Sequence, residues 1–251
     1  MTDPNRNSML IWWPAVKDLG IPVPRTVIVE TPTPDLLVRT GLALDGGAPE
    51  DFPPEWADYM QQVQAAADCM GYPLFMRTDL FSGKHEWEKT CYVAEGKDLG
   101  QHILDLVILG ECMSLWGFNH RAVALRKFLN LDSPFVAPGF KNMPVAREWR
   151  YFVRDGKIQC RHFYWVEDAV AQSKPIIQDW QARLRDLQRM LPSEQLVLDR
   201  YAKRVAQALP GCWSVDFAFG ADGTIYLIDM ATGEDSWHPE CAAAERAAKE
   251  A

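Results

Sequence analysis

The sequence predicts an α+β fold, in which pairs of antiparallel strands pack against amphipathic helices. Apolar strand-like runs occur in pairs joined by tight turns, and the dipeptide Asp155-Gly156 is the strongest two-residue hairpin signal in the chain. Two segments, 174–191 and 193–209, instead carry apolar residues at helical spacing. Paired strands together with such helices favour layers of helix on antiparallel sheet.

The remaining elements follow from local composition. The prolines in 19–26 make the start of the chain stiff, and the Pro-, Gly- and acid-rich segment 31–54 predicts an ordered excursion or a flexible loop. The other expected elements, in chain order, are a short helical or irregular entry within 8–30 that ends in a β-branched run, a helix over 55–70, strands over 74–78 and 90–93 around a loop at 79–85, a helix over 97–115, a strand over 122–129, a connection over 132–144, paired strands over 145–154 and 157–166, and paired strands over 213–219 and 224–230.

Composition limits the classes of protein and of partner. With 251 residues, of which 48% are hydrophobic and 24% charged, the chain has the profile of a soluble protein of one or two domains. The net charge of −8 disfavours general nucleic-acid binding, so a phosphate site must be local. Six cysteines without a C-x-x-C pair favour core positions in a reducing, cytoplasmic setting. The apolar patch 9–16 is short and broken by Pro14, which supports neither a signal peptide nor a membrane span.

Two carboxylates, Asp216 and Asp229, lie on the apolar strands 213–219 and 224–230. Alternation places Asp216 on the same face as the small residues Ser214 and Ala218, which leaves room beside it. Buried acids need a cation or hydrogen-bond donors, and Mg²⁺ shared with substrate phosphates uses few protein oxygens. The pair therefore predicts a magnesium site, with a hydrogen-bonded structural pair of aspartates as the alternative.

Basic residues follow the strand at 74–78. Arg77 leads into a loop that contains Ser82, Gly83 and Lys84, and these supply positive charge and approachable backbone N–H groups for a polyphosphate. The spacing is not that of a P-loop, so an exposed basic hairpin is the alternative.

A third segment carries alternating charges over 145–154. Glu148, Arg150 and Arg154 share one face of the expected strand. Arg150 is suited to binding a phosphate or carboxylate with Glu148 holding it in place, and an exposed ion pair of little energetic value is the alternative.

The order of these segments resembles the ATP-grasp superfamily, over roughly residues 19–235. The resemblance is greatest to a divergent, phage-associated branch in which an arginine replaces the first phosphate-binding lysine. The motifs that carry it are the Gly-Ile-Pro-Val-Pro stretch at 20–24, Arg77 with Ser82-Gly83-Lys84, the strand 124–129, Arg147-Glu148-Trp149-Arg150, and Val215-Asp216-Phe217 followed by Leu227-Ile228-Asp229.

The resemblance implies two α+β subdomains whose antiparallel sheets grip ATP, and three segments: a lead-in and helical region (1–70), an N-subdomain (71–130) and a C-subdomain (131–251). It also implies roles for individual residues. Arg77 and Lys84, with the loop residues Ser82 and Gly83, would hold phosphates, Arg126 or Lys127 would approach the nucleotide, Phe128 and Leu129 would belong to the adenine-facing linker, Asp132 would reach the ribose, Arg150 with Glu148 beside it would contact the γ-phosphate or an acyl-phosphate, and Asp216 and Asp229 would bind Mg²⁺.

One departure from the superfamily concerns the metal strand. Typical members end with Glu-x-Asn, whereas this chain has Asp229-Met230-Ala231, so it offers a shorter acid and no amide; Thr232 or Asp235 are candidate substitutes. This departure leaves open a member that binds ATP with little turnover.

Two functions are consistent with the resemblance. One is an ATP- and Mg²⁺-dependent ligase that joins a carboxylate, such as an amino acid or peptide, to an amine or thiol through an acyl-phosphate. The other is an ATP-binding assembly or chaperone-like protein similar to the initiation-factor assembly branch, with an interface near Trp87, Trp116 or Trp237. A nucleic-acid ligase is disfavoured, because the lysine near Asp155-Gly156 lies on the wrong side for a K-x-D-G motif. Host cytoplasm is the expected location if the chain is phage-encoded, with no membrane partner.

Overall fold

The structure, a computed structural model, describes residues 5–44, 52–113 and 120–241. The chain divides into two compact units, which we call unit 1 (1–23, 130–136 and 144–251) and unit 2 (24–129 and 137–143). This division differs from the three expected segments, because residues 1–23 belong with the C-terminal half and 24–70 belong with the sheet that follows them. Among the described residues, no helix is sufficiently long and apolar to span a bilayer.

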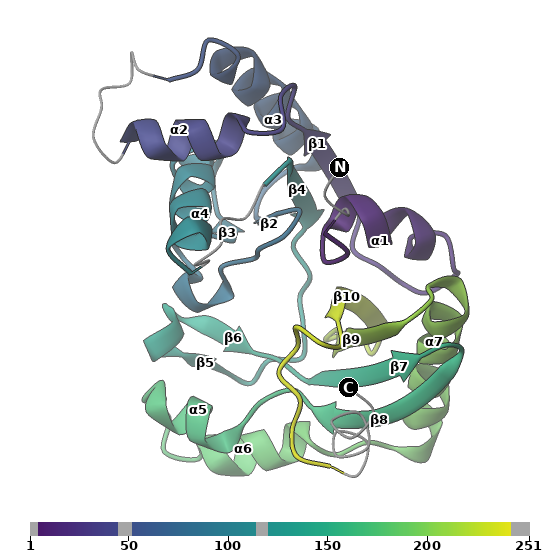
Figure 1. The fold of residues 1–251 in the computed structure, drawn as a ribbon. Coiled ribbons are helices and arrows are strands. Elements are labelled where there is room, and N and C mark those ends of the chain that lie inside the picture. Colours follow the sequence, from purple (N-terminus) through teal and green to yellow (C-terminus); the bar gives the residue numbers. More distant parts are fainter. Residues whose placement is uncertain (1–4, 45–51, 114–119, 242–251) are drawn as a thin grey trace. The chain divides into compact units, whose positions relative to one another are not determined.

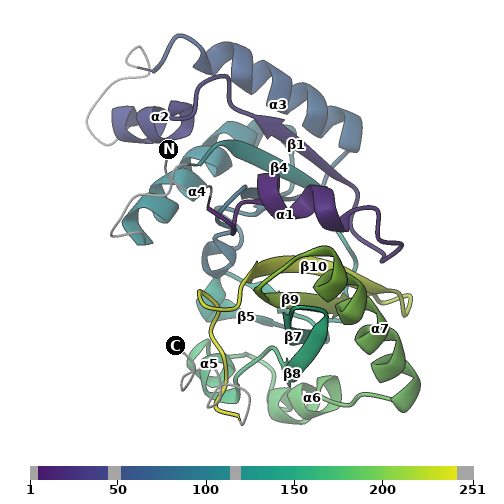
Figure 2. The same cartoon turned by 45° about the vertical axis from the view of Figure 1, so that its right-hand side comes forward.

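Unit 2 contains a four-stranded antiparallel sheet with the order β1-β4-β2-β3. Two long amphipathic helices, α3 and α4, pack on one face of it (Figures 1 and 2). The elements are β1 (Thr26–Glu30), α2 (Leu36–Leu44), α3 (Trp56–Met70), β2 (Leu74–Thr78), β3 (Tyr92–Val93), α4 (Leu99–Met113) and β4 (Ala122–Lys127), with a 3-10 turn at Lys84–Glu86.

The core of unit 2 lies between the sheet and these helices. Leu74, Met76, Val123 and Leu125 are fully buried and belong to one cluster with residues of α3 and α4. Since side chains alternate along a strand, the residues between them point to the opposite face of the sheet. The polar residues of β2 and β4 therefore share the face away from the helices.

Unit 1 contains a second four-stranded antiparallel sheet, with the order β10-β9-β7-β8. Helix α7 packs on one face, where the Tyr151 hydroxyl donates to Asp199 at 3.0 Å. Its elements are α1 (Met9–Val16), β7 (Glu148–Arg154), β8 (Lys157–Phe163), α5 (Glu167–Gln172), α6 (Trp180–Leu187), α7 (Pro192–Ala208), β9 (Cys212–Phe219) and β10 (Ile225–Thr232), and a hairpin β5 (Phe135–Ala137) and β6 (Met143–Val145) precedes β7.

The β7–β8 hairpin forms at the predicted dipeptide. Asp155 and Gly156 both have positive φ, 45° and 80°, as a two-residue turn with the twist of a hairpin requires. The strand pairs β2–β3 and β9–β10 and the helices α3 and α7 also lie where the sequence predicts them, within a few residues.

Three expected elements are wrong in extent. The expected helix over 174–191 is reduced to α6, because Lys174, which precedes a proline, has φ 56°, and helix starts only at Trp180. The expected strand over 145–154 is interrupted between β6 and β7. The segment 31–54 contains helix α2, whose apolar residues Leu36 and Leu37 are buried; 45–51 lie outside the described residues.

Candidate functional site

A row of polar side chains crosses the sheet of unit 1, one from each strand. Asp229 of β10 lies opposite Asp216 of β9, which lies opposite Arg150 of β7, and Arg150 lies opposite His162 of β8. Directly opposed residues of neighbouring strands point to the same face. Tyr151 of the adjacent position contacts α7, so this row lies on the face away from that helix.

Arg150 and Asp216 form a two-pronged ion pair at the centre of the row. The Nε and Nη2 atoms of Arg150 donate to the two carboxylate oxygens of Asp216 at 2.7 and 2.8 Å, and Asp216 is only 3% exposed. Nη1 of Arg150 donates to the carbonyl of Trp237 at 3.2 Å. Burial opposes the charge on Arg150, but Asp216 outweighs it, so the pKa of Arg150 is raised. The arginine is therefore held charged and aligned.

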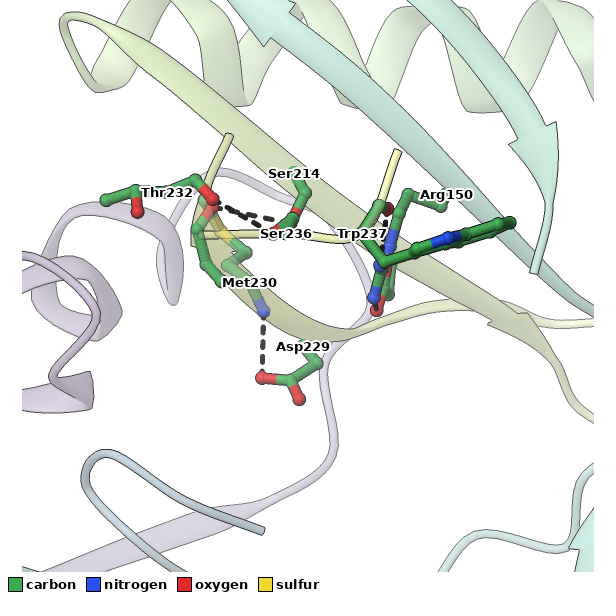
Figure 3. Close-up of polar contacts among 9 residues, drawn as sticks. Arg150, Ser214, Asp229, Met230, Thr232, Ser236 and Trp237 are labelled. Carbon is green, nitrogen blue, oxygen red and sulfur yellow. Dashed lines mark hydrogen bonds and ion pairs between the residues drawn. The ribbon is translucent and has the colours of Figure 1, made fainter. Parts of the chain in front are cut away.

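Asp229 lies beside this pair, after a bulge between Leu227 and Asp229. Its Oδ1 accepts from the backbone N–H of Met230 at 2.9 Å (Figure 3). Asp216 and Asp229 supply carboxylate oxygens on one face, which is the donor chemistry that Mg²⁺ prefers. Both oxygens of Asp216 already accept from Arg150, but each carboxylate oxygen carries a second lone pair. The residues present therefore fit a magnesium ion.

The two candidate substitutes for the missing amide are part of another network. The hydroxyl of Thr232 donates to Asp235 at 2.7 Å, and the Asn7 side chain donates to the same carboxylate at 2.7 Å. The Asn7 side-chain oxygen accepts from the backbone N–H of Thr232 at 2.6 Å. These contacts tie the start of the chain to the end of β10.

The chain after β10, which we call the tail (233–241), crosses the face that carries the polar row. Ser236 lies 2.5 Å from the Ser214 hydroxyl of β9, and the Trp237 carbonyl accepts from Arg150 of β7 (Figure 3). His238 stacks on Phe152 of β7 with ring centroids 3.8 Å apart. In Figure 1 the yellow segment after β10 follows this course past β9, β7 and β8. The tail is thus part of the site.

Glu148 occupies the same face as Arg150, two residues before it on β7. Its side chain is 6% exposed and lies opposite Ala218 of β9. The sequence predicts that Glu148 holds Arg150 in place, whereas the ion pair described above assigns that contact to Asp216.

In unit 2, two arginines occupy the sheet face away from the helices. Arg126 of β4 lies opposite Phe75 of β2, and Arg77 follows Phe75 by two residues, so both arginines share one face. Arg77 and Arg126 are 4% and 3% exposed, and Nε of Arg77 donates to the carbonyl of Thr78 at 3.0 Å. Buried arginines on a sheet face form a fixed positive surface.

The loop after β2 is compact. Gly83 has φ 61°, and a Cβ there would lie 2.8 Å from a methyl group of Leu106. The Thr90 hydroxyl donates to the Gly83 carbonyl at 2.8 Å, which anchors the start of the 3-10 turn that begins at Lys84. Ser82 and Lys84 are half-buried. The loop is a defined structure rather than a solvated basic hairpin.

The expected adenine linker leaves β4 at its end. Lys127 is exposed, whereas Phe128 packs edge-on against Tyr92 at 5.2 Å and lies 6.3 Å from Trp87. Leu129 is half-buried. The structure therefore places Phe128 in an aromatic cluster of unit 2, where Trp87 also lies; Trp116 lies outside the described residues.

Asp132 belongs to unit 1 and is exposed at the rim of a cavity. The cavity measures about 350 Å³, and its lining includes Arg147, Arg183 and Glu194. Arg147 pairs with Glu194 at 2.6 and 2.9 Å, and the pKa of Glu194 is lowered, mainly by this hydrogen bonding. Sequence reasoning assigned no role to this group of charges.

Sequence reasoning also missed a cluster of sulfur and imidazole groups. Cys160, His162, His238 and Cys241 offer ligand atoms that all lie within 4.8 Å of one another. The cysteines were expected in the core, but only Cys91 is fully buried, and Cys69 and Cys112 are exposed. The spacings Cys-x-His and His-x-x-Cys were the available signal, and they become informative only when the tail is known to cross β8.

Comparisons with known proteins fit this architecture. A sequence model of the ATP-grasp domain, the one that describes the third family of its clade, matches residues 51–250. No curated protein matches the sequence.

Solved structures with a similar fold were also found. Cdc123 from Schizosaccharomyces pombe is 9% identical, with a TM-score of 0.61 over 97% of this chain and 90% of that one. The ADP complex of purK, an N5-carboxyaminoimidazole ribonucleotide synthetase, is 14% identical, with a TM-score of 0.50 over 92% and 46%. D-alanine–D-alanine ligase from Bacillus anthracis, complexed with ATP, is 15% identical, with a TM-score of 0.47 over 96% and 59%. At such identities the likeness to Cdc123 and purK establishes the fold alone.

Proposed function

This chain belongs to the ATP-grasp family, and from that premise we propose that it binds ATP with Mg²⁺ and uses it to join a carboxylate to an amine or thiol. The observation that carries the proposal is the row of Arg150, Asp216 and Asp229 on one face of the sheet of unit 1. A fixed cation beside two carboxylates is the arrangement that phosphoryl transfer needs, because catalysis there is mainly positioning and charge stabilisation.

Residues of both units would contribute to nucleotide binding. We assign phosphate binding to Arg77 and Lys84 with the backbone of Ser82 and Gly83; Arg77 would stand in for the usual lysine. The buried face that Arg77 and Arg126 share supports this assignment, since fixed guanidinium groups bind phosphate oxygens in defined geometry.

The adenosine part would be held by the segment that follows β4. In this proposal Arg126 or Lys127 approaches the nucleotide, the backbone at Phe128 and Leu129 pairs with adenine, and Asp132 accepts from the ribose. The aromatic packing of Phe128 supports a linker of fixed conformation, because a side chain held on two rings keeps its backbone in place.

Asp216 and Asp229 would hold Mg²⁺. The ion, when bound, neutralises charge on the phosphate oxygens and on the phosphoryl group in transfer. Asp216 would serve two partners at once, because its oxygens also orient Arg150. Removing this carboxylate should therefore disturb both the arginine and the metal.

The reaction itself requires no covalent protein intermediate. A carboxylate oxygen of the substrate attacks the γ-phosphorus, the bond from that phosphorus to the β,γ-bridging oxygen breaks, and ADP leaves. The amine or thiol then attacks the acyl carbon, phosphate leaves, and the nucleophile loses a proton. Arg150 would contact the γ-phosphate or the acyl-phosphate, with the buried Glu148 beside it on β7.

Two measurements test this proposal. Calorimetry should detect ATP binding that depends on Mg²⁺, and incubation with amino acids and peptides should release ADP and phosphate together. Asp229→Asn should abolish the Mg²⁺ dependence, whereas Arg154→Gln, at an exposed position of unit 1, should leave it unchanged. Absence of heat from ATP with Mg²⁺ present would refute nucleotide binding.

A second candidate function is an ATP-binding assembly protein with little turnover. The departure at Ala231 and the commitment of both Asp216 oxygens to Arg150 favour it, because each leaves fewer oxygens for the metal. Trp237 is 56% exposed and suits an interface. Tight ATP binding without phosphate release for any small substrate, together with a stable protein partner, would select this function over ligation.

The phage-associated branch and the host-cytoplasmic location stay predictions from the resemblance. So do the expected boundaries of the subdomains, for which the two compact units suggest a different division.

A further inference from the structure

Four potential metal ligands meet where the tail crosses β8. Cys160 and His162 are two residues apart on β8 and lie on one face of it, while His238 and Cys241 come from the tail. Their ligand atoms lie within 4.8 Å of one another, and all four residues are half-buried. None of the six cysteines forms a disulfide.

The distances resemble those of a tetrahedral site. Sγ of Cys160 lies 3.0 Å and Sγ of Cys241 lies 3.4 Å from Nε2 of His238. With Zn–S and Zn–N bonds of about 2.3 and 2.05 Å at tetrahedral angles, sulfur and nitrogen ligands are about 3.6 Å apart. Small rotations of the four side chains would therefore bring them around one ion.

His162 supplies an independent observation. Its Nε2 atom is buried and has no hydrogen-bond partner among the described residues. A buried polar atom without a partner costs about 1 to 3 kcal/mol, so such an atom beside two thiols and a second imidazole is suited to a cation. Two sulfurs and two imidazoles are the ligand set of closed structural zinc sites, whereas Mg²⁺ requires oxygen ligands.

We propose that Cys160, His162, His238 and Cys241 form a zinc site that fastens the tail to β8. On binding, the two thiols release their protons to solvent and bind as thiolates, while the two imidazoles bind through a nitrogen lone pair. No external coordination position is left, so the ion is structural. It is distinct from the proposed Mg²⁺ site, which is made of carboxylates on β9 and β10.

The zinc site would act on the polar row through the tail. Trp237 immediately precedes His238, and its carbonyl accepts from Nη1 of Arg150 at 3.2 Å. Fixing His238 and Cys241 on β8 fixes that carbonyl over Arg150 at the centre of the row. Zinc would thus hold Arg150 in the orientation that Asp216 also supports.

The test uses the full chain, reduced and treated with a chelator, and then titrated with Zn²⁺ alone. One equivalent of zinc should remain bound after gel filtration. Co²⁺ should give the d–d bands of a tetrahedral site together with charge-transfer bands from thiolate. Cys160→Ser and Cys241→Ser should each lower zinc affinity at least tenfold and lose the thiolate bands, whereas Cys112→Ser, at an exposed cysteine in α4, should change neither.

Hydrogen exchange provides the second readout. Zinc should slow amide exchange in 233–241 in the unaltered chain and not in His238→Ala, with circular dichroism confirming that the variant is folded. Stoichiometric zinc absent from the reduced chain, cobalt bands unchanged in both cysteine variants, or a Cys160–Cys241 disulfide in place of metal binding would each overturn the proposal. None of these results depends on ATP, so the site fails or stands separately from the ligase function.

Discussion

The replacement Asp216→Asn tests whether the ion pair with Arg150 is the structural centre of the row. Arg150 and Asp216 have side-chain exposures of 16% and 4%, and the two guanidinium-to-carboxylate contacts measure 2.7 and 2.8 Å. An asparagine retains the shape and one acceptor oxygen but turns the other into a donor that faces a guanidinium N–H. Arg150 would therefore remain charged, largely buried, and without its counter-charge.

The size of the effect follows from this burial. Removing one partner of a buried ion pair costs about 3 to 5 kcal/mol, because the remaining charge is left uncompensated. An opposite charge at about 4 Å contributes a similar amount, about 4 kcal/mol, at the effective dielectric constant near a protein surface. We expect Asp216→Asn to lower the free energy of unfolding by about 3 kcal/mol, at the lower end of that range, since one of the two hydrogen bonds survives.

Equilibrium denaturation in urea measures this loss. Two matched variants serve as controls: Asp229→Asn retains the contact from the Met230 N–H and should lose less than about 1 kcal/mol, and Glu234→Gln removes an exposed pair with Arg154 at 3.9 Å. Calorimetry should show that the variants of Asp216 and Asp229 both lose Mg²⁺-dependent ATP binding. If Asp216→Asn is as stable as the Glu234 variant, the pair does not hold the row together.

Three further predictions concern other parts of the chain. Burial lowers the pKa of His120 to about 4, so stability should fall as the pH drops from 6.5 towards 4, by on the order of 2 kcal/mol at pH 5; urea midpoints at pH 7.5 and 5 should show a smaller difference in His120→Asn, and equal slopes would contradict the buried neutral imidazole. Gly83→Ala should cost about 1 to 3 kcal/mol and weaken ATP binding, because its Cβ meets Leu106 at φ 61°; an unchanged thermal midpoint would show that the loop adapts. Tyr151→Phe should cost about 1 kcal/mol by removing the bond to Asp199, measured by urea denaturation against the double variant with Asp199→Ala, and additive losses would show no coupling.

Local patterns predicted much of the fold because the relevant forces act over short separations. The Asp155-Gly156 turn needs only two residues with positive φ, and alternation along 213–219 is enough to place Asp216 on a face apart from the aromatic residues. These features depend on neighbours in the chain. The helix near 180 was overestimated because an apolar stripe does not show where a residue that precedes a proline, such as Lys174, leaves the helical region.

The partners within the candidate site were harder to predict. Arg150 and Asp216 are 66 residues apart, and Cys160 and His238 are 78 residues apart, so their pairing depends on strand order and on the course of the tail. Glu148 was a nearer candidate for Arg150 on the same strand face. Sequence alone ranks neighbours by spacing, whereas the sheet β10-β9-β7-β8 decides which of them meet.

The two ends of unit 1 are joined by contacts that link Asn7 to Thr232 and Asp235, and Arg204 to the carbonyls of Leu19 and Gly20 at 3.1 Å. On the ribosome these partners emerge about 190 residues apart or more, which at typical synthesis rates is a delay on the order of 10 to 40 s. All of unit 2 has emerged before β9 and β10 are made. Unit 2 can therefore acquire its structure during translation, while the first 23 residues wait for the last strands of their own sheet, exposed to chaperones and proteases until synthesis is nearly finished.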